Sequence, residues 1–460
     1  MNRVFPEEFA ERVTSQEYIN RDSLLAALSD DSPVSIRLNT AKWSSAPRSA
    51  QRVPWCDTGY YLPERPLFTL DPLFHAGCYY VQEASSMFLE VVFKSVGGDG
   101  EGLRILDMCA SPGGKSTHLA LLAGPGSILI SNETVRSRLG ALVENTIRWG
   151  ASNTLISNND PGDFERLPGY FDIILVDAPC SGEGMFRKQE VRSMWSTAGC
   201  DLCSDRQRRI LKSAWECLRP GGKLIYSTCT FNPVENEDNV RWLTETHGAV
   251  TVSIDITQYE GIQEIGGRGW MGYGFHPGKI KGEGFFIAAV MKPLNEEEVE
   301  SRRGWSVSRQ TGRGVPSGIS ELLIRHNGSL ILWGDRCFHL PGHGDEMSML
   351  QKNLNLIRKG TEICSIKRNG IIPSHELSVS ELLRGEAFPV IELSWSEAIR
   401  YLRRDSLPVK SEMAHGWCLV TYSGVRLGFV NNIGTRLNNY YPASYRIRMD
   451  AGRTEVRVLT

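Results

Sequence analysis

Short apolar runs alternate with amphipathic stretches through the middle of the chain, from about residue 91 to residue 293. The runs are rich in Val, Ile and Leu and are bounded by turn residues, which is typical of buried strands. Residues 115–122 and 137–149 lie between runs and follow the helical period instead. Because strands that alternate with helices form parallel sheets covered on both faces, we predict a doubly wound α/β domain. The predicted strands are 103–108, 127–132, 153–157, 171–176, 222–227 and 285–291.

The flanking regions have different patterns. Residues 1–90 combine an alternating strand at 34–40 with helical stretches, so we predict a small α+β domain there. We place the end of the 91–293 domain at the acidic stretch 294–298. Residues 294–378 contain Gly-rich turns and little periodicity, and we assign them to an intermediate domain of unclear fold. Residues 379–460 are rich in strands, with runs at 416–422 and 427–432, and form the last predicted domain.

Charge restricts where a nucleic acid could bind. The 460 residues carry a formal net charge of −2, so any such surface must be a local patch. Residues 395–460 contain ten Lys or Arg against five Asp or Glu. Cations with interleaved aromatic side chains suit RNA, although a small β-barrel with a solvated basic face has the same composition. The aromatic residues interleaved with the cations include Trp417, Tyr422, Phe429, Tyr440, Tyr441 and Tyr445.

The apolar runs and the cysteines of the chain indicate where the protein is found and whether it binds a metal. The chain begins without an apolar signal core and has no run of about 18 apolar residues, so we expect a cytoplasmic protein that does not enter a membrane. Its eleven scattered cysteines are then expected to be reduced. Cys200 and Cys203 have the spacing of half a zinc site, but no second pair follows, and we predict no metal site.

A Gly-rich loop at 107–116 follows the first predicted strand of the α/β domain. Glycines allow a ligand close to the backbone, and the following helix N-terminus supplies free amides. A dinucleotide loop needs Gly-x-Gly-x-x-Gly, which is absent, and a P-loop needs glycine where Cys109 stands. An S-adenosylmethionine loop and a purely structural turn remain. The candidate cofactor residues are Cys109, Ala110, Ser111, Pro112, Gly113, Gly114 and Lys115.

Four successive strands deliver a carboxylate to the same edge of the predicted sheet: Asp107, Glu133, Asp160 and Asp177. Any one of them is explained as a helix cap or a turn residue. A carboxylate after the second strand can bind both ribose hydroxyls, and one after the third can accept from an adenine amino group. We therefore predict that the four together bind S-adenosylmethionine.

Two cysteines, Cys180 and Cys229, each follow an apolar strand and should reach the edge of the sheet where ligands bind. Each alone could be a small buried apolar side chain. Together, beside a cofactor loop, they indicate covalent chemistry at one site.

Three strings, 107–116, 177–184 and 227–237, resemble the RNA cytosine-C5 methyltransferase family. Residues 81–87 and 282–286 are similar to the segments at the two ends of its catalytic domain, so the resemblance spans about residues 30–293. The chain has Ala110-Ser111 where the family commonly has two alanines, which leaves backbone contacts possible. Its long C-terminal extension is similar to that of the family's bacterial F subgroup, which acts on 16S rRNA.

The resemblance implies a Rossmann-like, S-adenosylmethionine-dependent methyltransferase domain and a C-terminal PUA-like RNA-binding region. It assigns Cys229 as the nucleophile and Cys180 to product release, whereas the Pro-Cys motif of DNA enzymes would favour Cys180 as nucleophile. Asp177 would polarise the base, and Lys188 would orient the base or the aspartate.

The implied partner is 16S rRNA in the small ribosomal subunit or its precursor, and we expect a monomer. A tRNA cytosine-C5 methyltransferase and a ribosome-assembly protein with a vestigial site are the alternatives. Arg37 and Asn39 of the N-terminal domain are candidate RNA contacts, as is the basic C-terminal segment.

Overall fold

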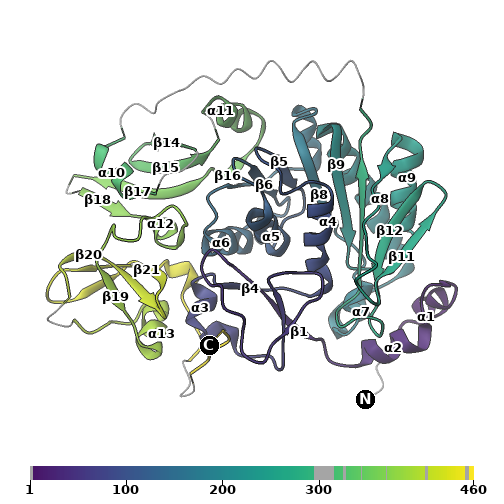
Figure 1. Cartoon of the computed structure of the whole chain (residues 1–460), viewed down its shortest axis with the longest axis horizontal. Coiled ribbons are helices and arrows are strands. Elements are labelled where there is room, and N and C mark those ends of the chain that lie inside the picture. Colours follow the sequence, from purple (N-terminus) through teal and green to yellow (C-terminus); the bar gives the residue numbers. More distant parts are fainter. Residues whose placement is uncertain are drawn as a thin grey trace.

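The computed structural model describes residues 4–294, 315–324, 328–342, 344–368, 370–409, 413–450 and 455–459. The acidic stretch predicted as a boundary, except Leu294, lies outside these residues. The described chain contains four sheets, the largest of which has helices on both faces (Figure 1).

The central sheet confirms the predicted α/β fold. Its five parallel strands run in the order β9-β8-β5-β6-β7, so the chain reverses direction across the sheet between β5 and β8. The last strand, β13, pairs antiparallel with β9 and is followed at that edge by β12 and β11. The strands are β5 (Arg104–Asp107), β6 (Ile128–Asn132), β7 (Thr154–Ser157), β8 (Phe171–Asp177), β9 (Leu218–Thr228), β10 (Val250–Thr251), β11 (Gln263–Gly267), β12 (Trp270–Phe275) and β13 (Phe285–Met291).

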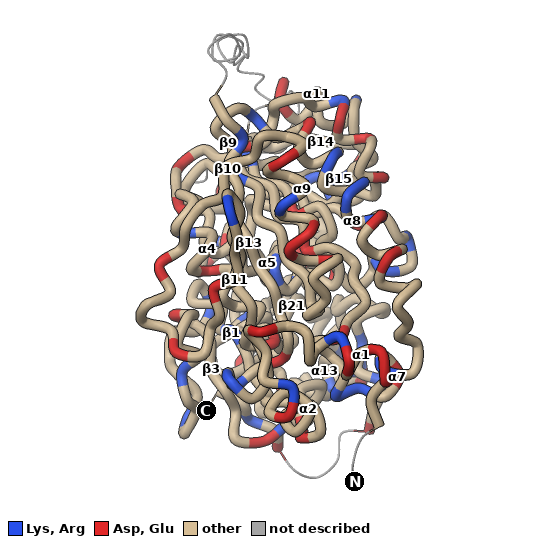
Figure 2. Tube along the Cα trace, turned by 90° about the vertical axis from the view of Figure 1, so that its right-hand side faces the viewer, with Lys and Arg blue, Asp and Glu red and all other residues tan. Residues whose placement is uncertain are grey.

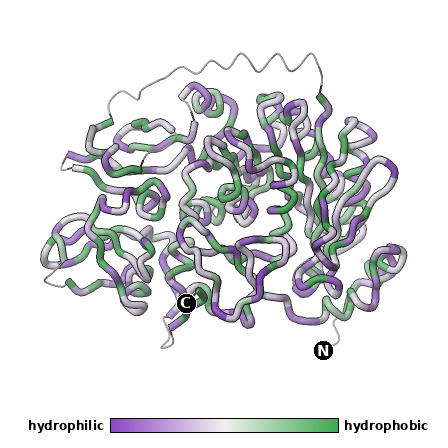
Figure 3. Tube along the Cα trace, in the orientation of Figure 1, coloured by the Kyte–Doolittle hydropathy of each residue, from purple (hydrophilic) through white to green (hydrophobic). Residues whose placement is uncertain are grey.

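Apolar side chains alternate between the two faces of this sheet and build a core on each. Ile210 and Leu243, from α8 and α9, pack in one core, and Phe93 and Leu119, from α4 and α5, pack in the other. Figure 3 shows hydrophobic colour along these strands. The helices are α4 (Leu89–Ser95), α5 (Gly114–Leu122), α6 (Leu139–Trp149), α7 (Gln189–Met194), α8 (Thr197–Cys217) and α9 (Glu237–His247).

The N-terminal region forms a sheet in the order β2-β3-β1-β4, preceded by helices α1 and α2. The expectation that Arg37 and Asn39 contact RNA is wrong, because both side chains are buried. Arg37 donates to Gln82 and Thr117 and lies over the Trp149 ring. The elements are α1 (Glu7–Thr14), α2 (Arg21–Ser29), β1 (Val34–Leu38), β2 (Gln51–Arg52), β3 (Gly59–Leu62), α3 (Pro72–His75) and β4 (Tyr79–Val81).

Residues after 314, whose fold the sequence did not reveal, form a sheet in the order β14-β15-β17-β18. Strand β16, which lies between β15 and β17 in the sequence, does not join that sheet. It pairs antiparallel with β7 of the central sheet, with Leu356 opposite Ser157. The central sheet therefore gains an edge strand from a distant part of the sequence. The elements are α10 (Ser317–Glu321), β14 (Gly328–Trp333), β15 (Arg336–Pro341), α11 (Gly344–Asn353), β16 (Leu356–Arg358), β17 (Thr361–Lys367), β18 (Gly370–Pro373) and α12 (His375–Val379).

The C-terminal sheet, β19-β20-β21-β22, packs against the N-terminal region. Ile36 and Tyr79 of the N-terminal sheet share one hydrophobic core with Tyr401 and Val420. No helix in the described ranges is long and apolar enough to cross a membrane. The C-terminal elements are β19 (Val390–Glu392), α13 (Trp395–Arg403), β20 (Gly416–Tyr422), β21 (Val425–Asn432) and β22 (Leu437–Asn439).

Candidate functional site

The two cysteines singled out from the sequence lie side by side. Asp177 at the end of β8 stands opposite Ser227 of the parallel neighbour β9, so the segments that leave both strands emerge together. The Sγ atoms of Cys180 and Cys229 are 2.9 Å apart, and the backbone amide of Cys229 donates to Cys180 Sγ at 3.3 Å. Both cysteines are free thiols.

The environment of Cys180 favours its protonated form. Its hydrogen bond with Cys229 raises the pKa of the Cys180 thiol well above its usual range, and burial acts in the same direction. Either sulfur can donate in this contact; with Cys180 protonated, its thiol can donate to Cys229 Sγ, and such a bond stabilises negative charge on the acceptor sulfur.

Asp177 is held beside the cysteines by two partners. Its Oδ2 atom lies 2.8 Å from the Lys115 ammonium, and its Oδ1 atom accepts from the Ser227 hydroxyl at 2.8 Å. Lys115 comes from the first turn of α5 and also lies over the Phe285 ring. About a third of the Asp177 side chain (32%) remains exposed, so a ligand at the strand ends can reach the carboxylate.

Lys188, predicted to orient the base or the aspartate, lies at the surface just before α7. Its ammonium lies 4.0 Å from the Met185 sulfur. The ammonium that pairs with Asp177 belongs to Lys115, which the sequence assigned only to the cofactor loop.

The Gly-rich loop turns sharply into α5. Gly113 precedes this helix with a φ of 109°, a left-handed conformation that favours glycine. A Cβ atom on Gly114 would lie 3.2 Å from the Tyr80 ring, which leaves little room for a larger residue. The first amides of α5 have no partner within the helix and can bind a polar ligand group.

Asp107 lies beneath this loop and is fully buried. Its Oδ2 atom accepts from the Ser116 hydroxyl at 2.6 Å, while Oδ1 has no hydrogen-bond partner of normal geometry. Burial raises the pKa of Asp107 to about 7, although the Ser116 hydroxyl and the Cys109 amide act against the rise. A buried carboxylate with one unused oxygen suits a ligand that donates a proton or carries positive charge.

Glu133 and Asp160 follow β6 and β7 as predicted, but their partners differ. Glu133 is buried, accepts from the Val135 amide at 2.7 Å and lies 3.5 Å from the Arg138 guanidinium. Asp160 instead caps the short 3₁₀-helix Pro161–Arg166 and pairs with exposed Arg209 at 3.1 Å. The bonds that Asp160 makes are thus those of a helix cap, which was the alternative to cofactor binding.

Buried carboxylates that we did not select from the sequence hold the two cysteine segments. Glu183 accepts from the Phe231 amide at 3.3 Å and from Arg12 of α1 at 2.6 Å. Glu235 accepts from the Ser181 amide and the Gln207 side chain, both at 2.9 Å. Both glutamates lie in motif strings, but their partners come from distant elements, so their supporting roles were not readable from spacing.

Cys200 and Cys203 both lie on α8, and neither belongs to a group of three or more candidate metal ligands in the described residues. The group that does qualify comprises Cys56, Glu90 and His118 and is separate from the two thiols above.

Comparison with known proteins gives matches along almost the whole chain. A family model of 16S rRNA methyltransferase RsmB/F matches residues 98–291. The model of the N-terminal domain of 16S rRNA methyltransferase RsmF matches residues 5–84, and that of the methyltransferase RsmF PUA domain matches residues 388–447.

Similar full-length relatives come from two bacterial genera. Ribosomal RNA small subunit methyltransferase F of Shewanella loihica is 31% identical, over 93% of this chain and 92% of the relative. Its counterpart in Vibrio parahaemolyticus is 30% identical, over 96% of this chain and 97% of the relative. Among solved structures, a methyltransferase homolog from Pyrococcus horikoshii is 27% identical with a TM-score of 0.53, covering 63% of this chain and 95% of that one.

Proposed function

The chain belongs to the family of ribosomal RNA small subunit methyltransferase F, and we propose that it methylates carbon 5 of a cytosine in 16S rRNA. The observation that carries this proposal is the contact between the thiols of Cys180 and Cys229 at the ends of adjacent strands. Carbon 5 of cytosine is a poor nucleophile until a thiolate adds to carbon 6, so a thiol with a second thiol beside it suits this base.

S-adenosylmethionine is the cofactor of the family and supplies an activated methyl group when bound. The unused Oδ1 atom of buried Asp107 and the free amides of α5 fit its polar groups. Glu133 would bind the ribose hydroxyls, and residues 109–115 would lie along the ligand. Asp160 would reach the adenine only by sharing its bonds to Arg209 and the Gly162 amide.

Cys229 acts as the nucleophile in this scheme. Its thiolate adds to carbon 6, forms a carbon–sulfur bond and shifts electrons toward carbon 5 and the ring nitrogen. Water supplies a proton to that nitrogen, and Asp177, fixed by Lys115 and Ser227, accepts a hydrogen bond from the resulting N–H; the proton returns to water when the carbon–sulfur bond breaks. Once carbon 5 carries its methyl group, water removes the proton from that carbon, and the carbon–sulfur bond breaks with Cys229 leaving as a thiolate.

Cys180 assists the departure of Cys229. Its proton, retained because its pKa is raised, forms a hydrogen bond to the sulfur that leaves. The carboxylates Glu183 and Glu235 keep the two cysteine segments in register through the bonds described above.

Two cysteine variants test these roles with the full chain, S-adenosylmethionine and small-subunit RNA. Cys180→Ala should accumulate a protein–RNA adduct that survives denaturing gel electrophoresis. Cys229→Ala should form no adduct and no 5-methylcytosine, while Cys203→Ala on α8 is the matched control and should turn over normally. An adduct in Cys229→Ala, or none in Cys180→Ala with RNA bound, would contradict the assignment.

The choice of RNA requires a separate experiment. Figure 2 shows acidic and basic residues interspersed over one face, so overall charge does not select a substrate. Bisulfite sequencing of total RNA from cells with and without this protein should reveal a site in 16S rRNA that depends on it. A dependent site in tRNA alone would refute the ribosomal substrate but retain cytosine-C5 chemistry.

A further inference from the structure

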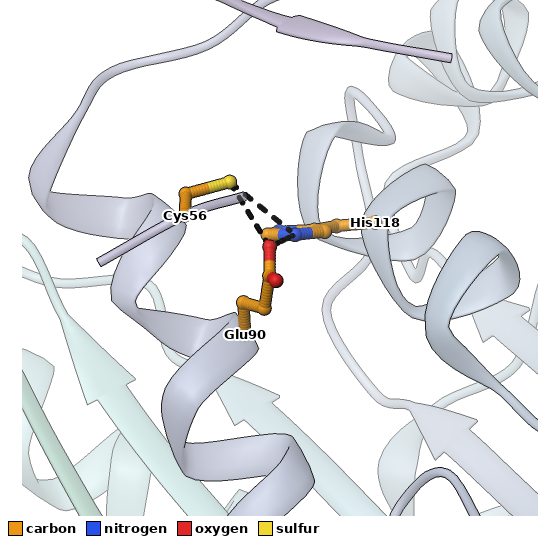
Figure 4. A group of neighbouring side chains, drawn as sticks. All are labelled: Cys56, Glu90 and His118. Carbon is orange, nitrogen blue, oxygen red and sulfur yellow. Dashed lines mark hydrogen bonds and ion pairs between the residues drawn. The ribbon is translucent and has the colours of Figure 1, made fainter. Parts of the chain in front are cut away.

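A second cluster of reactive side chains lies where the N-terminal region meets the catalytic domain (Figure 4). Cys56 comes from the turn between β2 and β3, Glu90 from α4 and His118 from α5. Their exposed fractions are only 2%, 3% and 0%. Three separate elements thus deliver a thiol, a carboxylate and an imidazole to one enclosed point.

The three candidate ligand atoms are close together. Cys56 Sγ and His118 Nε2 lie 3.1 and 3.2 Å from the same Glu90 oxygen, Oε2, and 3.9 Å from each other. The circle through three atoms at these separations has a radius of about 2.0 Å, which matches zinc–nitrogen and zinc–oxygen bond lengths and is close to the zinc–sulfur length of about 2.3 Å. An ion held a little out of the plane of these three atoms, as tetrahedral coordination requires, would therefore lie within bonding distance of all of them.

We propose that Cys56, Glu90 and His118 bind a divalent transition-metal ion, for which Zn²⁺ is the best match. Sulfur, nitrogen and oxygen donors together are typical zinc ligands, whereas Mg²⁺ and Ca²⁺ prefer oxygen alone. A thiolate and a carboxylate carry two negative charges, which attract a divalent ion to this buried point, while Lys94 pairs with the outer oxygen of Glu90 and the buried Arg37 lies near the cluster.

The surroundings of Glu90 support this assignment. Its other oxygen, Oε1, accepts from the Lys94 ammonium at 2.6 Å and from the Asp57 amide at 3.4 Å. Carboxylates that bind metals are held in this way by outer hydrogen bonds, which leave one oxygen directed at the ion. The Thr58 hydroxyl, 3.7 Å from Cys56 Sγ, would complete four-fold coordination.

The site has a structural role, because its burial denies access to RNA. His118 is on α5, the helix that begins at Gly113 and Gly114 of the cofactor loop and carries Lys115. An ion bound between α5, α4 and the β2–β3 turn fixes that helix to the N-terminal region. Loss of the ion should therefore weaken S-adenosylmethionine binding without removing any group that contacts the RNA.

Metal analysis of the purified full-length protein tests the proposal. After incubation with Zn²⁺ and removal of unbound metal, mass spectrometry should find one ion per chain. Cys56→Ser and His118→Asn should each lose that ion. Cys78→Ser, a buried cysteine of the same region outside the cluster, is the matched control and should retain it.

A Cys180→Ser/Cys229→Ser variant separates this site from the thiols of the active site. When Co²⁺ replaces zinc, this variant should still show the absorption of a cobalt–thiolate bond, and adding Cys56→Ser should abolish it. A folded wild-type chain without stoichiometric zinc would overturn the proposal even if the cluster variants fail to fold. So would cobalt–thiolate absorption that disappears with Cys180 and Cys229, since the ion would then belong to the active site.

Discussion

Replacing Arg12 by methionine tests how strongly helix α1 supports the catalytic segments. The guanidinium of Arg12 lies 2.6 Å from a Glu183 oxygen, with side-chain exposures of 22% and 0% for the two partners. Removing one partner of a buried pair costs about 3–5 kcal/mol, because the other charge stays buried without compensation. The partial exposure of Arg12 places the loss near the lower value, about 3 kcal/mol, which for a chain of 460 residues corresponds to a fall of about 3 °C in melting temperature.

The loss should depend on pH in a defined direction. Burial raises the pKa of Glu183 above its ordinary value of 4.5, and Arg12 opposes that rise. Without Arg12 the pKa of Glu183 rises further. At any pH above that raised value the folded variant is therefore destabilised by a charged carboxylate that is buried without a partner cation. As the pH falls from the raised pKa toward 4.5, Glu183 becomes protonated and the difference from wild type disappears.

Calorimetry of both proteins at about pH 8 and about pH 5 measures this difference. Arg21→Met removes an exposed pair with Asp22 and serves as the control that should leave the melting temperature unchanged. An unchanged melting temperature for Arg12→Met at about pH 8, or a larger loss at about pH 5, would refute the reasoning.

Three further predictions concern the ligands. Glu133→Gln should weaken S-adenosylmethionine binding about tenfold by calorimetry, since a charge-assisted bond contributes about 1.5 kcal/mol; unchanged affinity would exclude the ribose contact. Lys115→Met should lower single-turnover methylation more than RNA affinity, because Asp177 loses its ion pair, and normal turnover would contradict its positioning role. Arg446→Gln and Arg448→Gln are substitutions at exposed C-terminal positions. Each should reduce the slope of log RNA affinity against log salt concentration by about one; an unaltered slope would place the RNA elsewhere.

Hydrophobic patterning was sufficient to predict the five parallel strands of the central sheet and β13, but not β10, β11, β12 and β16. The strands at 103–108, 127–132 and 171–176 appear as β5, β6 and β8 with ends shifted by no more than about two residues. Strand β9 is longer than predicted and begins at Leu218 rather than 222, because it pairs with β8 on one side and β13 on the other. The turn residues near a strand do not indicate that it will pair with a neighbour on both sides.

Contacts between distant segments explain what patterning missed. Arg37 looks like a surface cation in an alternating strand, yet Thr117 and Trp149 enclose it from far along the chain. From the sequence we expected Lys188 to orient Asp177, but the turn into α5 brings Lys115 to that carboxylate instead. The cysteine, glutamate and histidine of the proposed metal site have no short spacing that a motif would reveal.

Residues 379–460 were predicted to form a domain of their own, but their core is shared with the N-terminal region. Ile36 and Tyr79 pack in the same core as Val420. Deleting the last domain would therefore expose apolar surface of the N-terminal region, with effects well beyond RNA binding. Substitutions of exposed arginines are the sharper test of the RNA surface.

The pairing of β16 with β7 has a consequence for synthesis of the chain on the ribosome. About 200 residues separate the two strands, and at translation rates of about 5–20 residues per second β7 waits about 10–40 s for its neighbour. During that interval a nascent catalytic sheet presents an unpaired edge on which another chain can add a strand. The aggregation-prone edge of the catalytic sheet is thus covered only when β16 has been synthesised. By then the ribosome has long since passed the end of the catalytic domain's own sequence.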